Sequence, residues 1–374
     1  MKKTLLAAAL FAGLAGAAQA ETSVTLYGIL DTGYGYSQIK YDRNDIRVRS
    51  TSSGLASGVV SGNRWGVRGS EDLGDGLRAI FTLEAGFDIG SGGNSSKSGA
   101  LFHRQSWVGL ASDHWGSFTM GRQYNMGNGF TYGSANVGVS MGDMDRTFGG
   151  QGSSNRMDNA FKYVTPSFSG FQAGVAYGNP NTSILSVDTP AGGANITERS
   201  NRLSAGLKYA SGPIDVSLSY DRESNALENA TTNWAIAGSY DFEVVKLHLA
   251  YGQDRYGKLG WANVASGLFT ADTRPAIGSY SLGHDFKSSN YYVGLSAPVG
   301  TGVLAVSWGR SASNLDDADK WGEDAKTQNI YHLNYKYPLS KRTSLYAYGS
   351  YGTGVGYVDG AKAKELGLGL NHRF

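Results

Sequence analysis

Apolar and polar side chains alternate with a period of two along most of the chain. In 214–221, Ile214, Val216, Leu218 and Tyr220 alternate with polar residues, and the segments 202–209, 244–252 and 365–374 repeat this pattern. Successive side chains of a β-strand point to opposite faces, so the pattern predicts strands with one apolar and one polar face. Apolar spacing typical of helices is nearly absent.

Sixteen segments follow this strand pattern, and connections of two lengths separate them. The expected strands are 23–36, 60–70, 77–90, 101–111, 117–123, 156–165, 171–178, 200–210, 214–222, 232–241, 244–254, 288–297, 303–311, 328–337, 343–351 and 362–374. Seven short turns alternate with eight long connections at 37–59, 91–100, 124–155, 179–199, 223–231, 255–287, 312–327 and 352–361. Short periplasmic turns and long extracellular loops are typical of an outer-membrane barrel.

A soluble β-sandwich also alternates, so alternation alone leaves two fold classes open. The segments have the length that a tilted strand needs to cross a bilayer, about 8–12 residues. Aromatic residues gather at segment ends, as in the girdles of membrane barrels: Tyr27, Trp65, Trp107, Tyr163, Tyr177, Tyr209, Tyr220, Tyr240, Tyr251 and Tyr337. We therefore expect an all-β fold, a transmembrane antiparallel β-barrel of about 16 strands around a water-filled channel.

The composition excludes several other classes of protein. The chain has 374 residues, of which 54 are glycine and none is cysteine, and only 17% are charged. The absence of cysteine excludes disulfide scaffolds and thiolate metal sites. After residue 20 no stretch approaches 18 consecutive apolar residues, so no membrane-spanning helix is predicted. The aromatic content, 12%, argues against disorder.

The first 20 residues have the pattern of a secretory signal peptide. Lys2 and Lys3 precede an apolar run over 5–18, and Ala18-Gln19-Ala20 is a small-x-small cleavage site. We therefore expect cleavage after Ala20 and a single barrel domain over 21–374. That mature chain has 31 basic and 31 acidic residues, so its net charge gives no reason to expect a nucleic-acid partner.

Several segments, in order along the chain, resemble one family. Ser61–Glu84 (SGNRWGVRGSEDLGDGLRAIFTLE) resembles the second strand, turn and third strand of Gram-negative general porins, especially those of β-proteobacteria. Further matches are Ser23–Asp31 (SVTLYGILD), Phe118–Arg122 (FTMGR), Asn155–Tyr177 and Pro338–Tyr346 (PLSKRTSLY). The terminal Phe374 resembles the aromatic assembly signal of outer-membrane barrels.

The resemblance implies a homotrimer in the outer membrane of a Gram-negative bacterium, in contact with lipid and lipopolysaccharide. The third loop, 124–155, would fold into the lumen and narrow each channel. The implied function is passive diffusion of ions and small hydrophilic solutes, with no catalytic residue, cofactor or metal. An acidic loop over 316–324 is expected to be solvated and bridged to lipopolysaccharide by divalent cations.

Alternation also predicts which charged side chains face the lumen. Because Trp65, Val67 and Phe161 take the lipid face, their neighbours of the other parity point inward: Arg64, Arg68, Arg78, Glu84, Arg156, Asp158 and Lys162. Simple alternation points Arg104 outward, although a bulge could turn it inward. The third loop carries Asp143 and Asp145 beside Arg146.

Charges at the narrowest section of a channel set its selectivity. We expect a basic wall of Arg64, Arg68, Arg78, Arg104, Arg156 and Lys162 opposite Asp143 and Asp145, and a mild anion preference. The alternative is that these charges only solvate the lumen, as charges do in any barrel of this size. For Arg64 and Arg156 the resemblance favours a filter role, because it places both near the constriction.

Two other functions stay open at this stage. A substrate-specific channel of the same fold would need an aromatic track on the third loop. The candidates for such a track are Tyr124, Phe130, Tyr132 and Phe148, but the same side chains could instead pack the loop against the wall. The second open function is that of a barrel whose outer loops carry enzymatic or adhesive activity. Gly138–Gly142 matches G-x-S-x-G, but that motif requires a strand-to-helix turn, and no helix is predicted there. The chain is therefore not expected to be an enzyme.

Overall fold

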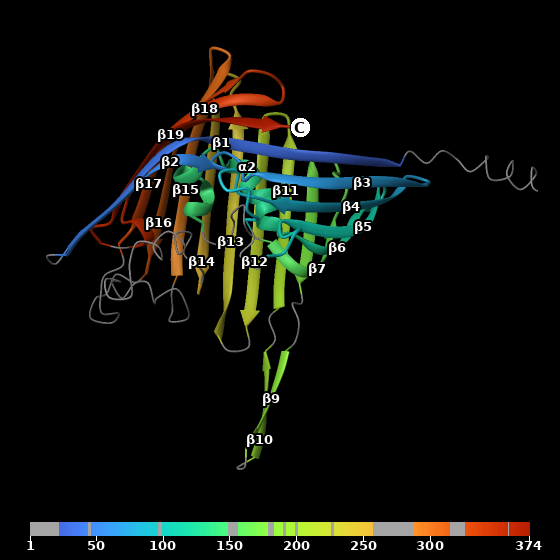
Figure 1. Cartoon of the computed structure of the whole chain (residues 1–374). Helices are drawn as coiled ribbons and strands as arrows, with labels where there is room; N and C mark the ends of the chain where they lie inside the picture. The colour runs from blue at the N-terminus through green and yellow to red at the C-terminus, as the bar shows by residue number, and fades with distance from the viewer. Residues whose placement is uncertain are drawn as a thin grey trace, which may run out of the picture.

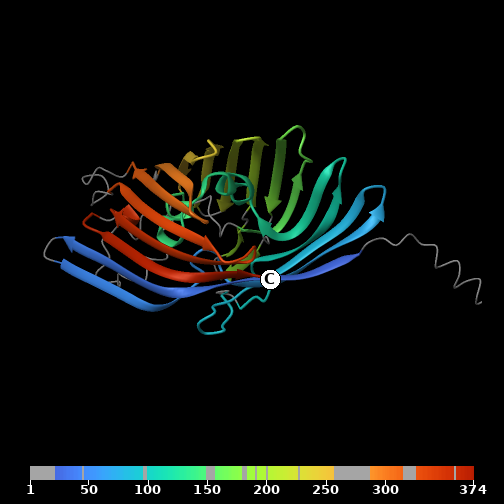
Figure 2. The same cartoon turned by 90° about the horizontal axis from the view of Figure 1, so that it is seen from above.

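The strands form one closed barrel (Figures 1 and 2). The computed structural model describes residues 22–43, 46–95, 99–148, 156–178, 183–189, 192–198, 201–225, 228–256, 287–314, 326–357 and 359–374. β2 and β3 pair one after the other along the same strand, β1, and together fill a single place in the wall. The wall therefore has the sixteen antiparallel strand positions predicted from the sequence. The predicted signal peptide and the acidic loop over 316–324 lie outside the described residues.

The strands up to the middle of the chain are β1 (Ser23–Arg43), β2 (Ile46–Ser57), β3 (Arg64–Gly74), β4 (Leu77–Gly86), β5 (Gln105–Ser112), β6 (Gly116–Tyr124), β7 (Arg156–Val164), β8 (Phe171–Gly178), β9 (Ser183–Thr189) and β10 (Gly192–Glu198). The remaining strands are β11 (Asn201–Ser211), β12 (Ile214–Asn225), β13 (Glu228–Asp241), β14 (Lys246–Arg255), β15 (Lys287–Val299), β16 (Gly302–Ser313), β17 (Gln328–Pro338), β18 (Thr343–Thr353) and β19 (Lys362–Arg373). Short helical turns are η1 (Gly127–Tyr132), α2 (Gly133–Ala135), η2 (Ser140–Gly142), η3 (Met144–Arg146) and η5 (Val355–Tyr357).

The two ends of the chain close the barrel. β1 pairs with β19 from Ile29 opposite Arg373 to Lys40 opposite Lys362. Gly28 and Phe374 exchange two backbone hydrogen bonds of 3.1 and 3.2 Å. The Phe374 ring covers Gly28 so closely that a Cβ at this glycine would lie 2.3 Å from a ring carbon. The terminal aromatic residue therefore seals the seam between the first and last strands.

The outer face of the wall is apolar and the inner face is small or polar, which is the reverse of a soluble protein. Apolar side chains on the outer face are exposed, for example Leu218 at 43%, Ile236 at 46% and Leu249 at 48%. Their inward neighbours, such as Ala235 and Ser219, are small and buried under the third loop. An exposed apolar band of this extent needs an apolar solvent. Among the described residues, no helix is both long enough and apolar enough to cross a bilayer.

Two connections were predicted wrongly. The sequence suggested a long loop over 37–59, but β1 continues to Arg43 and β2 returns along it from Ile46 to Ser57. Residues 50–57 are mostly serine, threonine and glycine, so neither face of β2 is apolar in sequence. Backbone pairing with β1, which leaves no trace in the hydropathy pattern, makes this segment a strand. The predicted connection 179–199 likewise contains the β9–β10 hairpin, which extends beyond the other strands (Figure 1).

A buried carboxyl group holds the bend between β2 and β3. Asp31 is fully buried, and its two oxygens accept hydrogen bonds from the backbone amides of 59, 60 and 61 at 3.0–3.2 Å. They also accept bonds of 2.8 Å from the Tyr346 hydroxyl on β18 and the Asn371 amide on β19. Asp31 thus connects its own strand β1, the last two strands β18 and β19, and the segment that leads into β3.

Asp31→Ala should lower the free energy of unfolding by about 3 kcal/mol or more, because five hydrogen-bond donors, two of them on the buried Tyr346 and Asn371, would lose their acceptor. Urea unfolding of the protein in detergent micelles would measure this loss. Asp42→Ala is the control. Its carboxylate is 67% exposed and pairs at 3.4 Å with Arg47, so its removal should cost less than about 0.5 kcal/mol. Equal midpoints for the two variants would contradict the role given to Asp31.

Candidate functional site: the channel constriction

The third loop, between β6 and β7, lies inside the barrel against the inner wall (Figure 2). Hydrogen bonds to inward-facing polar side chains of the wall fix its first half. The Met126 amide donates to the Ser204 hydroxyl at 2.8 Å, and the Thr131 hydroxyl donates to Ser219 at 2.6 Å. The loop thus occupies part of the lumen, as predicted.

Apolar side chains of the loop pack onto small residues of the wall. Met126 and Phe130 pack with Met157, Ala160 and Ala176. Met144 and Phe148 belong to a second buried cluster with Ala135, Ala235, Ala237, Ala250 and Tyr292. Phe130 and Phe148 are therefore buried against the wall, and of the four aromatic residues considered for a track only Tyr124 and Tyr132 line the channel.

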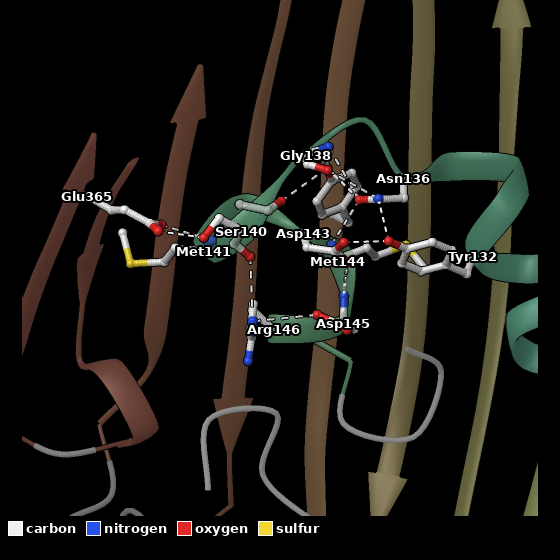
Figure 3. A network of polar contacts seen from close by, with 12 residues as sticks. Tyr132, Asn136, Gly138, Ser140, Met141, Asp143, Met144, Asp145, Arg146 and Glu365 are labelled. Carbon is white, nitrogen blue, oxygen red and sulfur yellow. Dashed lines mark hydrogen bonds and ion pairs between the residues drawn. The ribbon is translucent and has the colours of Figure 1, made fainter. Parts of the chain in front are cut away.

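The second half of the loop is held by strands nearer the end of the chain, β15, β17 and β19 (Figure 3). Glu365 on β19 accepts hydrogen bonds from the Ser140 hydroxyl and the Met141 amide. The Tyr292 hydroxyl on β15 accepts from the Gly138 amide at 2.9 Å, and Asn334 on β17 donates to the Val137 carbonyl at 2.9 Å. Sequence reasoning missed Glu365 as part of the site, although its parity opposite Leu366 already marked it as inward-facing.

A cavity of about 780 Å³ lies between the third loop and the wall of β1 to β3. The charged residues of its lining are Arg64, Arg104, Arg146, Arg156, Asp143, Asp145 and Glu365. Serine hydroxyl groups line the cavity on the side of β2, among them those of Ser52, Ser53, Ser57 and Ser61. Four cations and three acidic groups therefore share one polar cavity.

Three of the predicted arginines form a cluster with Tyr124 and Glu84. The Tyr124 hydroxyl accepts hydrogen bonds from Arg104 at 3.0 Å and from Arg156, whose guanidinium lies 4.3 Å from the centre of the tyrosine ring. Arg104 also forms an ion pair of 2.8 Å with the buried Glu84, and Arg64 approaches the same carboxylate at 4.0 Å. One carboxylate therefore offsets only part of the charge of this arginine cluster.

Arg104 is part of this cluster because it precedes its strand. β5 begins at Gln105 rather than at 101 as predicted, so alternation does not fix the direction of residue 104. Arg64 reaches its position from the first residue of β3, where its Nε donates to the Gly62 carbonyl at 2.9 Å. The bend held by Asp31 therefore sets the place of Arg64.

The other predicted basic residues lie outside this cavity. Lys162 donates to the Tyr124 carbonyl at 3.1 Å, and Arg68 lies 5.4 Å from the centre of the Tyr27 ring. Arg78 pairs at 2.9 Å with Asp113 in the short turn between β5 and β6. The structure thus brings Arg64, Arg104 and Arg156 together and leaves Arg68, Arg78 and Lys162 apart from them.

The prediction that Asp158 faces the lumen was wrong. The pairing of β6 with β7 shifts register between Gly121 and Gln123, and Asn159 has a φ of 48°. This bulge leaves Met157 buried against the third loop, and Asp158, 57% exposed, pairs with Arg122 instead. A bulge reverses the parity of the residues beyond it, and nothing in the alternation marked its position.

The acidic groups of the third loop lie side by side. Asp143 accepts hydrogen bonds from the Tyr132 hydroxyl and from the Asp145 amide, the latter at 3.0 Å, and Asp145 pairs with Arg146 at 3.6 Å. Burial, together with the neighbouring Asp145 carboxylate, raises the pKa of Asp143 well above the usual range of a carboxyl group. The Asp143 carboxyl group therefore keeps its proton to a higher pH than an ordinary aspartate does.

Within the described ranges, no three histidine or acidic side chains come together as metal ligands would. The G-x-S-x-G match lies in the irregular third loop, where η2 begins at Ser140 and the serine hydroxyl binds Glu365. It is therefore a contact of the loop with the wall and has no strand-to-helix geometry.

A profile described as Gram-negative porin matches residues 4–357. The chain belongs to the Gram-negative porin family. An outer membrane porin protein of Bordetella pertussis is 42% identical over the whole of both chains. Outer membrane porin protein 32 of Delftia acidovorans is 30% identical over 98% of this chain and 92% of its own.

Solved structures agree with this membership. The anion-selective porin from Comamonas acidovorans is 25% identical, with a TM-score of 0.67 over 95% of this chain and all of its own. The trimer form of OmpT from Vibrio cholerae, 16% identical with a TM-score of 0.59 over 94% of this chain and 99% of its own, shares the fold. This porin is thus an outer-membrane protein of a Gram-negative bacterium and a passive diffusion channel rather than an enzyme.

Proposed function

We propose that this porin is a homotrimer of channels with a mild anion preference, set by Arg64, Arg104 and Arg156. The observation that carries the proposal is the arginine cluster at the wall of the cavity. Arg104 and Arg156 both bind the Tyr124 hydroxyl, and Arg64 approaches the Glu84 carboxylate that Arg104 also binds. Charges that line the narrowest section act through low-dielectric walls, which strengthen their field. The likeness to a porin described as anion-selective supports the sign, and the trimer form of a protein with the same fold supports the assembly.

Planar-bilayer recording of the purified protein tests the proposal. Current steps in groups of three would support an open trimer. In a salt gradient, the zero-current potential should have the sign of preferential anion flow. A potential of the opposite sign would refute the anion preference, and absence of conductance would refute an open channel.

The geometry does not favour a substrate-specific channel with an aromatic track. Phe130 is 6% exposed and Phe148 is 1% exposed, and both pack against the wall. Two tyrosines remain in the lining, and Tyr124 is engaged by Arg104 and Arg156. Conductance that saturates with a single solute would instead indicate a dedicated binding site.

The anion preference should decline as the pH rises through the raised pKa of Asp143. Below that pKa the carboxyl group is neutral and the lining is more positive, whereas above it the group adds a negative charge opposite the arginines. The zero-current potential, measured in one salt gradient over a series of pH values, checks this sign. Asp143→Asn should remove this part of the pH dependence. An unchanged pH profile in that variant would show that another group is responsible.

A further inference from the structure

Gln328, the first residue of β17, joins two loops that meet inside the barrel. Its side chain is buried, and its Nε2 donates a hydrogen bond of 2.8 Å to the carbonyl of Arg146 on the third loop. The Oε1 of the same amide accepts a hydrogen bond of 3.0 Å from the backbone of Gly356, which precedes β19. Each end of this one amide group is therefore bound to a different loop.

The loop that contains Gly356 is itself fixed to the wall through the short turn η5. Gly356 has a φ of 67°, a left-handed conformation that glycine adopts without steric cost. The next residue, Tyr357, is buried, and its hydroxyl contacts the buried Ser311 on β16. Val355 lies against Gly352 on β18, where an added Cβ would lie 2.9 Å from its Cγ2. The turn η5 can therefore hold the Gln328 amide in one orientation.

Arg146 is the arginine that the third loop contributes to the cavity, and its own side-chain contacts are long. Among the described residues, its Nε lies 3.6 Å from an Asp145 oxygen and 3.5 Å from the Ser140 carbonyl oxygen (Figure 3). Charge-assisted hydrogen bonds that hold a guanidinium firmly are shorter, about 2.7–2.9 Å. The position of this charge in the cavity therefore depends on where the backbone of Arg146 is held.

We infer that Gln328 is a positioning residue for Arg146 and, through it, for the ion preference of the channel. The inference rests on the proposed anion filter and adds to it a residue that is not part of the cavity lining. Without the amide, the Arg146 carbonyl loses the 2.8 Å bond that ties it to β17, and the guanidinium moves relative to the arginines of the opposite wall. Because η5 orients the same amide, the connection between β18 and β19 also influences ion preference.

A double-mutant cycle of zero-current potentials in one salt gradient tests this role. Gln328→Met keeps the size of the side chain and removes both hydrogen bonds of the amide. It should shift the potential in the same direction as Arg146→Gln, by roughly half as much, because the charge is displaced rather than removed. In the Arg146→Gln background the same change should cause no further shift, since no charge remains there to be displaced.

A control variant and a salt series separate this effect from a general change in the barrel. Asn329→Leu removes an amide at the next position of β17, where it accepts a hydrogen bond from Trp308 at 3.3 Å, and should leave the potential unchanged. The shift caused by Gln328→Met should be largest in dilute salt. Screening shortens the reach of a charge from about 10 Å at 0.1 M to about 3 Å at 1 M, whereas a narrower channel would lower the conductance at both concentrations.

Three results would each overturn the inference. They are wild-type potentials in both Gln328→Met and Gln328→Asn, an equal shift from Gln328→Met with and without Arg146→Gln, or an equal shift in Asn329→Leu. Gln328→Asn keeps a buried amide that is too short to reach both partners, so it keeps the test decisive if the methionine variant fails to fold. A wild-type channel that prefers cations would refute the proposed function alone, because the effect of Gln328 is measured as a difference from wild type.

Discussion

Replacing Arg64 and Arg156 together with glutamine should turn the channel from anion-preferring to cation-preferring. At a pH above the raised pKa of Asp143 the cavity lining has four arginines and three carboxylates, and this change leaves two positive groups against three negative ones. Arg104 is kept, because its loss would leave the buried Glu84 without its 2.8 Å partner. The zero-current potential in a salt gradient should therefore change sign, while the conductance in symmetric salt remains measurable.

The matched control removes two positive charges elsewhere. Arg68 and Arg78 lie outside the cavity, the latter paired with Asp113 in an exposed turn. Arg68→Gln with Arg78→Gln should leave the sign of the potential unchanged. If this control reversed the preference as well, the total charge of the barrel would matter more than the charge at the constriction. If neither variant reversed it, the arginine cluster would not be the filter.

Gly142→Ala should move the third loop away from its wall and lower the single-channel conductance. A Cβ at Gly142 would lie 2.0 Å from Cγ of His332. That imidazole cannot move aside easily, because it is buried and contacts Ser350 at 2.7 Å and Asn334 at 3.0 Å. Overpacking of this kind costs about 1–3 kcal/mol, which favours displacement of the loop into the lumen.

Gly133→Ala makes the same change in the same loop without the clash. Gly133 lies in α2, and no atom lies within 4 Å of an added Cβ. Alanine is favoured over glycine in a helical turn, so this variant should keep the conductance of the wild type. Equal conductances for Gly142→Ala and Gly133→Ala would show that contact with His332 does not set the position of the loop.

The barrel could be predicted from the sequence because its wall repeats one simple pattern. Leu218 and Ser219 take opposite faces by alternation alone, and so do most residues of the sixteen strand positions. The pattern failed where backbone hydrogen bonds alone hold a strand in the sheet, as in β2, whose serine-rich sequence has no apolar face. It also failed at Asn159, where a bulge with positive φ reversed the parity of Asp158.

The constriction was predictable only in part. The position of Arg64 followed from alternation together with the family resemblance, and that of Arg156 followed from the resemblance, because Arg156 lies beyond the bulge at Asn159. The contact of Arg104 with Tyr124 did not, because it depends on where β5 begins. Nor did the contacts of Glu365 and His332 with the third loop, since they join residues more than 190 positions apart. Long-range contacts to an irregular loop have no sequence periodicity from which to infer them.

The contacts of Asp31 link barrel assembly to the selectivity of the finished channel. Its carboxyl group binds Tyr346 and Asn371, which belong to the last two strands, and the amides of the bend that precedes Arg64. This carboxyl group has all five of its partners only when β18 and β19 lie in place beside the first strand. The contacts that close the barrel therefore also help to place Arg64 in the proposed filter.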